Sequence, residues 1–150
     1  MIVYPDTSFL CALYRPQGNS LLAADYFSRM KDPLPVSSPL LFEFRQSLRL
    51  QSFLHDRDQT KGFSAKEAGA VLAKLEENLR DGFLEILPVD WADIVSRAEL
   101  LSARHTVRDG TRGFDIIHVA TALHLKVKNF LTFDSVQRRL AQAEGLKTPL

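Results

Sequence analysis

The sequence has 150 residues, 45% of them hydrophobic and 25% charged, which is the balance of a soluble globular domain long enough to bury a core. Its net charge of +1 excludes binding to nucleic acid by bulk charge alone, so any RNA or DNA binding must come from a local basic patch or a metal ion. The single Cys11 cannot form an internal disulfide, no apolar run approaches bilayer length, and nothing at the N-terminus resembles a signal peptide, so we expect a cytoplasmic protein.

Short apolar runs alternate with longer helical patterns along the chain, which predicts an α/β fold with a parallel sheet. The expected strands are residues 2–5, 34–37, 84–88 and 129–133, with a further short edge strand near 146–148. The expected helices are residues 8–14, 19–31, 39–55, 64–81, 90–106, 114–127 and 135–144. No repeat, low-complexity tract or linker interrupts the alternation, so we expect a single domain over residues 1–150.

Two of the expected helices carry clear boundary signals. Ser64 and Glu67 have the spacing of a capping box, and Asp81-Gly82 is a typical helix stop. Asp90 precedes the next helix, in which one apolar stripe contains Ile94, Val95, Ala98 and Leu101. The amphipathic pattern accounts for the acidic residues of both helices, so we expect them to form scaffold.

Four other acids lie where an α/β chain turns toward a common edge. Asp6 closes the first apolar run and Asp134 ends the last long one, while Asp115 opens a nearly all-apolar helix. Glu43 lies one turn into the helix that follows the second run. Ligands of open α/β sheets bind beyond the carboxyl ends of the strands, so these four residues can converge. Because clustered carboxylates repel one another strongly in a low-dielectric pocket, such a cluster needs a cation.

Each of these acids also has a simpler explanation. Asp6 and Asp134, taken singly, are better explained as helix N-caps than as metal ligands, and Asp134 with Gln137 reads as a capping box. Capping leaves room for a second role, because a carboxylate has two oxygens and about four acceptor sites. The sequence therefore leaves both roles open for these two residues.

Glu43 and Asp115 are harder to explain as scaffold. Glu43 flanks the apolar stripe of its helix, and a half-buried glutamate needs a cationic partner, for which an arginine is as plausible as a metal. Asp115 is the one acid of an apolar helix, in a first turn where the helix dipole favours negative charge on any face. His118 lies one turn further and fits a buried, hydrogen-bonded histidine with at most a supporting role.

The four acids, in this order, resemble those of the PIN-domain nucleases, and the chain looks most like the VapC-type toxins of prokaryotic toxin–antitoxin pairs. The matching segments are Val3-Tyr4-Pro5-Asp6-Thr7-Ser8, Glu43 in its helix, Phe114 to Leu123, and Leu131-Thr132-Phe133-Asp134. The resemblance implies a three-layer α/β/α sandwich on a parallel four- to five-stranded sheet. It also implies endonucleolytic cleavage of RNA, an antitoxin that docks over the acid-lined groove, and a homodimer.

The implied site holds Mg²⁺ or Mn²⁺ on Asp6, Asp115 and Asp134, with Glu43 completing it or accepting a proton from water. Ser8, His118 and Thr132 are assigned supporting roles. Carboxylates suit a hard divalent cation, which activates a water for attack on the phosphodiester, and the chain has no zinc-binding pattern. Candidate contacts to the substrate backbone are basic residues on either side of the Asp115 helix, although solvated surface is the commoner situation for any one of them: Arg108, Arg112, Lys126 and Lys128.

Three rival interpretations remain open. A phosphatase with an aspartyl nucleophile also begins on a first-strand aspartate, but it typically needs a second one where this chain has Ser8. A PIN-like fold that only binds a partner would not need all four acids. A nuclease with a housekeeping RNA or DNA substrate would have the same residues as a toxin.

Overall fold

A computed structural model describes residues 3–150, so the first residue of the expected strand 2–5 lies outside the described part. The described residues form seven helices and four strands, which divide between two compact units. Unit 1 contains residues 3–9 and 87–150, and unit 2 contains residues 10–86. The single domain expected over residues 1–150 stays a prediction.

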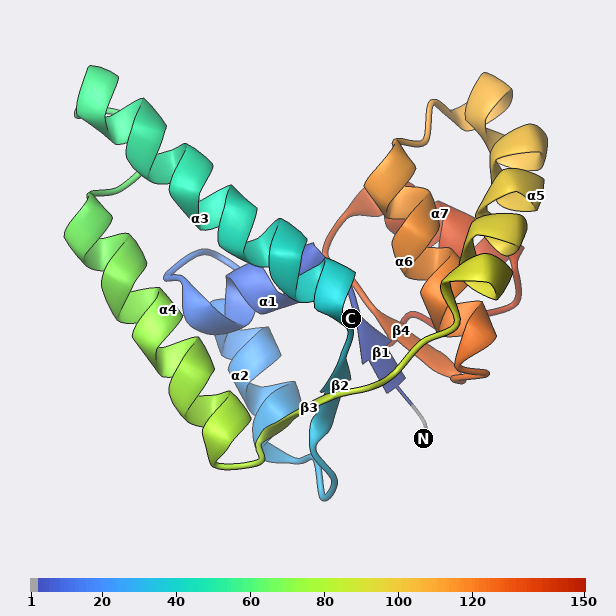
Figure 1. The fold of residues 1–150 in the computed structure, drawn as a ribbon, viewed down its shortest axis with the longest axis horizontal. Helices are drawn as coiled ribbons and strands as arrows, with labels where there is room; N and C mark the ends of the chain where they lie inside the picture. The colour runs from blue at the N-terminus through green and yellow to red at the C-terminus, as the bar shows by residue number, and fades with distance from the viewer. Residues whose placement is uncertain (1–2) are drawn as a thin grey trace. The chain divides into compact units, whose positions relative to one another are not determined.

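Unit 1 is built on one parallel strand pair. Its elements are β1 (Val3–Pro5), the first turn of α1 (Thr7–Tyr14), α5 (Trp91–Asp109), α6 (Gly113–His124), β4 (Asn129–Leu131) and α7 (Ser135–Ala143) (Figure 1). β1 pairs with β4 with Tyr4 opposite Phe130, and Asn129 also bridges in parallel to Lys147, where an edge strand was expected. Helix α6 packs against β1, α5 and α7, so it lies at the centre of this unit.

The burial of α6 and α5 follows their sequence patterns, with one exception. Helix α6 has apolar residues on most sides, and Ile116, Val119 and Ala120 are all buried. On α5, Ile94, Ala98 and Leu101 are buried as predicted, but Val95 is 50% exposed, so its assignment to the stripe is wrong. Consecutive helical positions point about 100° apart, so a neighbour of Ile94 leaves the buried face.

Unit 2 contains the second parallel strand pair. Its elements are α2 (Ser20–Ser28), β2 (Leu34–Val36), α3 (Ser38–Arg57), α4 (Ala65–Arg80) and β3 (Leu84–Ile86), together with the rest of α1. Helices α3 and α4 run side by side (Figure 1), and Leu34 of β2 lies opposite Leu84 of β3. The predicted capping box at the start of α4 is confirmed, because Ser64 Oγ accepts from Glu67 N and Glu67 Oε2 accepts from Ser64 N at 2.8 Å.

The predicted α/β class with parallel strands is confirmed. Within residues 3–150 the strands form two parallel pairs of three-residue strands, where a four- to five-stranded sheet was expected. β4 ends at Leu131, since the backbone N–H of Phe133 donates to a side chain, Ser8 Oγ. Helix α5 runs to Asp109, beyond the expected end, and stops where Gly110 adopts the left-handed φ of 66°. None of the helices in the described residues is long and apolar enough to cross a membrane.

Candidate active site

Asp6 occupies the turn between β1 and α1 and is completely buried. Its Oδ1 caps α1, accepting hydrogen bonds from Phe9 N at 2.9 Å and from Ser8 Oγ at 2.6 Å. Its Oδ2 accepts from Thr132 Oγ1 at 2.5 Å. Burial raises the pKa of the Asp6 carboxyl above its usual 3.8, although the hydrogen bonds from Ser8, Thr132 and Phe9 act in the opposite direction. The ionised carboxylate would therefore be stabilised by a cation at this position.

Two hydroxyl groups connect the end of β1 to the segment that follows β4. Thr132 is completely buried, and its Oγ1 donates to Asp6 Oδ2 while accepting from the backbone N–H of Asp134 at 3.0 Å. Ser8 Oγ donates to Asp6 and accepts from Phe133 N at 2.8 Å. Both residues thereby hold the carboxylate of Asp6 in a set orientation, and their supporting role in catalysis stays a prediction.

Asp134 uses its two carboxylate oxygens differently. Oδ1 accepts from the backbone N–H groups of Val136 and Gln137 at 2.8 and 2.9 Å, so Asp134 is the N-cap of α7, as the simpler interpretation predicted. Oδ2 makes no contact with the cap and lies 4.0 Å from Arg112 Nη2. The cap therefore fixes the carboxylate and leaves one oxygen directed at a cation.

Asp115 lies in the first turn of α6 and is buried, with 6% of its surface exposed. Its Oδ2 accepts from the backbone N–H of Arg112 at 3.2 Å and from Arg112 Nε at 3.4 Å. One guanidinium group thus faces both Asp115 and Asp134. A continuous chain of polar contacts within unit 1 therefore runs through Asp6, Thr132, Asp134, Arg112 and Asp115.

His118 connects the Asp115 helix to the first turn of α1. The imidazole is completely buried, with Nε2 3.3 Å from Thr7 Oγ1 and its ring centroid 6.1 Å from that of Phe114. Thr7 is the residue after Asp6, so this contact helps to keep the start of α6 near the end of β1. The buried, hydrogen-bonded histidine expected at this position is confirmed, and a supporting role in catalysis stays a prediction.

Glu43 belongs to α3 in unit 2, whereas the three aspartates belong to unit 1. It is half-buried on the flank of a stripe that includes Leu40 and Phe44, as its position in the sequence predicts. The nearby Arg45 on the same helix forms an ion pair with Glu76 at 2.6 Å. The membership of Glu43 in the site stays a prediction.

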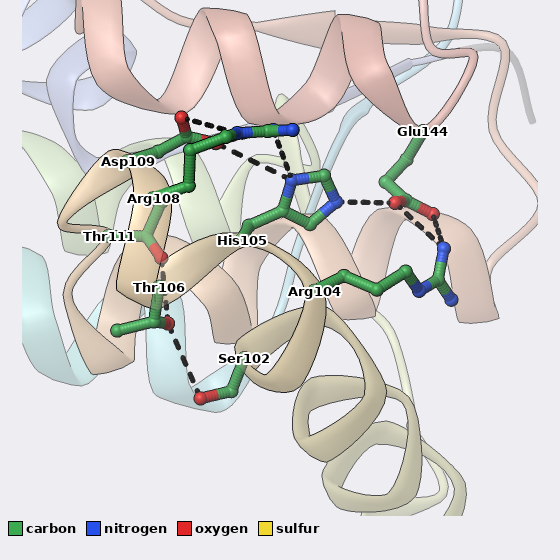
Figure 2. A network of polar contacts seen from close by, with 8 residues as sticks. All are labelled: Ser102, Arg104, His105, Thr106, Arg108, Asp109, Thr111 and Glu144. Atoms are coloured by element: carbon green, nitrogen blue, oxygen red, sulfur yellow. Dashed lines mark hydrogen bonds and ion pairs between the residues drawn. The ribbon is translucent and has the colours of Figure 1, made fainter.

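A second polar network fixes the end of α5, close in sequence to Arg112 (Figure 2). His105 is buried, with Nε2 2.7 Å from Glu144 Oε1 and Nδ1 3.6 Å from Asp109 Oδ2. Glu144, just after α7, also accepts from Arg104 Nη1 at 3.0 Å. These contacts join the end of α5 to the end of α7.

The same network holds the turn that leads into α6. Thr111 is buried, and its Oγ1 lies 3.0 Å from Oγ1 of Thr106, which in turn lies 3.3 Å from Ser102 Oγ (Figure 2). Gly110 supplies the left-handed residue at the turn. The backbone before Arg112 is therefore anchored on α5.

Replacing Glu144 by alanine is expected to lower the free energy of unfolding by about 1–3 kcal/mol, because buried His105 loses its shortest hydrogen bond. Urea unfolding monitored by circular dichroism measures the change. Glu99→Ala, at an exposed position on α5, is the matched control and should change stability by less than about 0.5 kcal/mol. Equal stability of the two variants would show that the network does not anchor this turn.

A comparison with protein families matches residues 3–143 to the PIN domain. This span includes all four predicted acids and every residue that connects the three aspartates. The chain belongs to the PIN domain family. Members of this family are nucleases, a class of hydrolase, and generally use a divalent metal ion. No curated protein matches the chain.

Solved structures show the PIN-like fold over nearly the whole chain. FitAcB from Neisseria gonorrhoeae aligns with a TM-score of 0.68 and 18% identity, covering 98% of this chain and 96% of that one. The sarcin-ricin loop cleaving toxin VapC20 from Mycobacterium tuberculosis has a TM-score of 0.66 and 20% identity, with 97% and 98% coverage. PAE2754 from Pyrobaculum aerophilum has a TM-score of 0.62 and 15% identity, with 99% and 90% coverage. At these identities the similarity shows the fold alone.

The donor set of this PIN domain suits a hard divalent cation, because Asp6, Asp115 and Asp134 offer carboxylate oxygens. As the side chains lie, no group of three or more His, Cys, Asp or Glu residues among residues 3–150 is arranged to hold a metal ion. In this arrangement Asp6 Oδ2 accepts a hydrogen bond from Thr132, and the other two carboxylates face Arg112.

Sequence reasoning missed the position of Arg112 in this PIN domain. It placed Arg112 among four candidate contacts to the substrate backbone, without a connection to the acids. The three-residue spacing between Arg112 and Asp115 is the signal in the sequence, because side chains three apart at a helix start are neighbours. Its contact with Asp134 depends on how α6 and α7 pack, which no local pattern encodes.

Proposed function

We propose that this PIN domain is a divalent-metal-dependent endoribonuclease and the toxin of a toxin–antitoxin pair. The observation that carries the proposal is the chain of polar contacts that joins three aspartates from three separate segments beyond the ends of β1 and β4. Aspartates that only cap helices have no need to lie in contact with one another. The carboxylate of Asp6 is also completely buried, which is unfavourable for a charge without a partner. The structural similarity to VapC20, a toxin that cleaves the sarcin-ricin loop, supports RNA as the substrate.

In this proposal Asp6, Asp115 and Asp134 hold Mg²⁺ or Mn²⁺. The metal ion supplies a more acidic coordinated water and offsets the charge that develops on the phosphoryl group. Ser8 and Thr132 orient the buried Asp6 carboxylate, and the N-cap of α7 orients Asp134. Glu43 is the proposed fourth acid, which completes the site or accepts a proton.

The proposed partners are RNA, a cognate antitoxin and a second copy of this chain, and the proposed location is the cytoplasm. All of these come from the resemblance to VapC-type toxins. A small DNA-binding protein encoded directly upstream of this chain would support the antitoxin, and light scattering of the purified protein would test the homodimer.

The test is cleavage of end-labelled structured RNAs, including a sarcin-ricin loop oligonucleotide, in EDTA, Mg²⁺ and Mn²⁺. We expect cleavage only with metal, and a loss of more than about 100-fold in Asp115→Asn, because an amide is a poor substitute for an ionised ligand. Asp32→Asn, at an exposed position in unit 2, is the matched control and should cleave like the wild type.

Other outcomes would point to the rivals. Phosphate release from small phosphomonoesters with intact RNA would support an aspartyl phosphatase. Calorimetry that detects no binding of Mg²⁺ or Mn²⁺ would support a PIN-like module that only binds a partner. Metal-dependent cleavage of DNA in place of RNA would leave the metal site standing and replace the substrate.

A further inference from the structure

Arg112 is a cation placed between two of the proposed metal-binding acids. Its Nε lies 3.4 Å from Asp115 Oδ2 and its Nη2 lies 4.0 Å from Asp134 Oδ2. Asp134 Oδ2 is the oxygen that the N-cap of α7 leaves unused. The guanidinium therefore faces one carboxylate oxygen of each of these two acids.

The ion pairs of Arg112 are favourable, but each contributes little free energy. An arginine keeps its charge at any physiological pH, so it offsets the repulsion between two neighbouring carboxylates. The Arg112 side chain is 78% exposed, however, whereas that of Asp115 is only 9% exposed. Ion pairs with one exposed partner contribute little, since water and salt screen them. The guanidinium can leave at a small cost in free energy.

We propose that Arg112 is a displaceable counter-cation of this site. In the metal-free protein it neutralises Asp115 and Asp134 and would compete with a divalent ion for these two carboxylates. Once the metal displaces it, its guanidinium binds a phosphate of the RNA backbone beside the site. This inference rests on the proposed function, because it needs the aspartates to bind metal.

The surroundings of Arg112 indicate a rotation of its side chain and not a movement of the loop. Gly110 and Thr111 before it are fixed on α5, through the turn and the contact with Thr106 (Figure 2). Its own backbone N–H donates to Asp115 Oδ2 at 3.2 Å in the first turn of α6, a contact that does not involve the guanidinium. A guanidinium that turns on this anchored backbone stays within reach of the site, and its planar donors match phosphate oxygens.

Arg108 shows that this placement is specific. It lies one turn earlier and was an equal candidate in the sequence, but its guanidinium is bonded to Asp109 at 2.7 and 2.9 Å. It also contacts His105 within the second network (Figure 2). Arg108 therefore stabilises the end of α5, and Arg112 faces the acids.

The first experiment titrates the metal-free protein with Mn²⁺ by calorimetry at low ionic strength. We expect Arg112→Ala to bind Mn²⁺ about 2- to 10-fold more tightly than the wild type, because a competing charge is removed. Arg112→Lys keeps the charge and should stay closer to the wild type. Arg29→Ala is the matched control, since Arg29 is 76% exposed and pairs with Asp25 at 2.7 Å; its affinity for Mn²⁺ should not change.

The second experiment measures binding of an RNA in which a methylene group replaces the bridging 3′-oxygen at the cleavage site, so that it cannot be hydrolysed, at saturating Ca²⁺. We expect Arg112→Ala to bind this RNA several-fold more weakly, with a salt dependence reduced by about one counterion. Arg29→Ala should bind it like the wild type.

The outcomes separate this inference from the proposed function. Mn²⁺ affinity of Arg112→Ala equal to or weaker than that of the wild type overturns the competition, and unchanged RNA affinity overturns the phosphate contact. If Asp115→Asn loses Mn²⁺ binding while Arg112→Ala behaves like the wild type, only the inference about Arg112 fails. If Asp115→Asn binds Mn²⁺ like the wild type, the proposed metal site itself fails.

Discussion

Replacing Asp6 by asparagine should reduce metal-dependent RNA cleavage by more than about 100-fold while the protein still folds. The amide is neutral and offers one oxygen in place of two, so it is a weaker ligand for a hard cation. The fold should survive because Asn Oδ1 can still accept from Phe9 N and Ser8 Oγ, which are the cap contacts of α1. Cleavage assays with Mn²⁺, together with circular dichroism, measure both parts. Metal-dependent cleavage retained by a folded variant would contradict the assignment of Asp6.

The same variant makes a prediction about the pH dependence of stability. Burial raises the pKa of the Asp6 carboxyl above 3.8, so the folded state binds its proton more tightly than the unfolded state does. The stabilisation from this group is present below the unfolded pKa and is lost as pH rises through the folded pKa. Asparagine does not titrate. In EDTA, the wild type should therefore lose stability relative to Asp6→Asn as pH rises from about 4 toward neutrality.

Urea unfolding in EDTA over this pH range measures the difference. A stability difference between wild type and Asp6→Asn that stays constant with pH would show that the buried carboxyl is not the cause. Asp32→Asn, which removes an exposed carboxylate, serves as the control for a general effect of charge. Adding Mn²⁺ should favour the wild type, since a ligand that binds only the folded state stabilises it.

Replacing Thr132 by valine should weaken Mn²⁺ binding about 10- to 100-fold, the usual effect of removing a group that orients a metal ligand. Valine has nearly the same shape, but it can neither donate to Asp6 Oδ2 nor accept from Asp134 N. Because Thr132 is completely buried, the same change should lower the free energy of unfolding by about 1–3 kcal/mol.

Thr132→Ser is the matched variant, because it restores the hydroxyl and lacks only a methyl group. In calorimetry, Thr132→Ser should bind Mn²⁺ with an affinity close to that of the wild type. Urea unfolding measures the free energy of unfolding of both variants. If valine and serine weaken Mn²⁺ binding equally, the methyl group matters and the hydroxyl does not. Thr132 would then be a packing residue and the connection between Asp6 and Asp134 would be incidental.

Features that depend on neighbours along the chain could be predicted from the sequence. The caps at Asp6 and Asp134 bind backbone N–H groups two or three residues away, so the N-caps predicted at both residues are confirmed. The capping box predicted for Asp134 and Gln137 is wrong in its second half, because Gln137 Oε1 makes no hydrogen bond. The capping box at Ser64 and the apolar character of α6 are local in the same sense. The predicted apolar stripe on α5 was wrong at Val95, which is 50% exposed. Adjacent residues of a helix point about 100° apart, so both can lie on one face only when they stand on either side of its centre line.

The sequence by itself therefore determined the α/β class, the helix starts, and the four acids that make this chain look like a nuclease. The tertiary structure decided which of them meet, through Thr132 bonded to Asp6 across 126 positions and Ser8 bonded to Phe133 across 125. It also decided what the second oxygen of each capping carboxylate faces: Thr132 for Asp6 and Arg112 for Asp134. Arg112 lies against Asp115 for the same reason. Such contacts depend on the packing of α6 and α7 around β1 and β4, and no local propensity or periodicity encodes them.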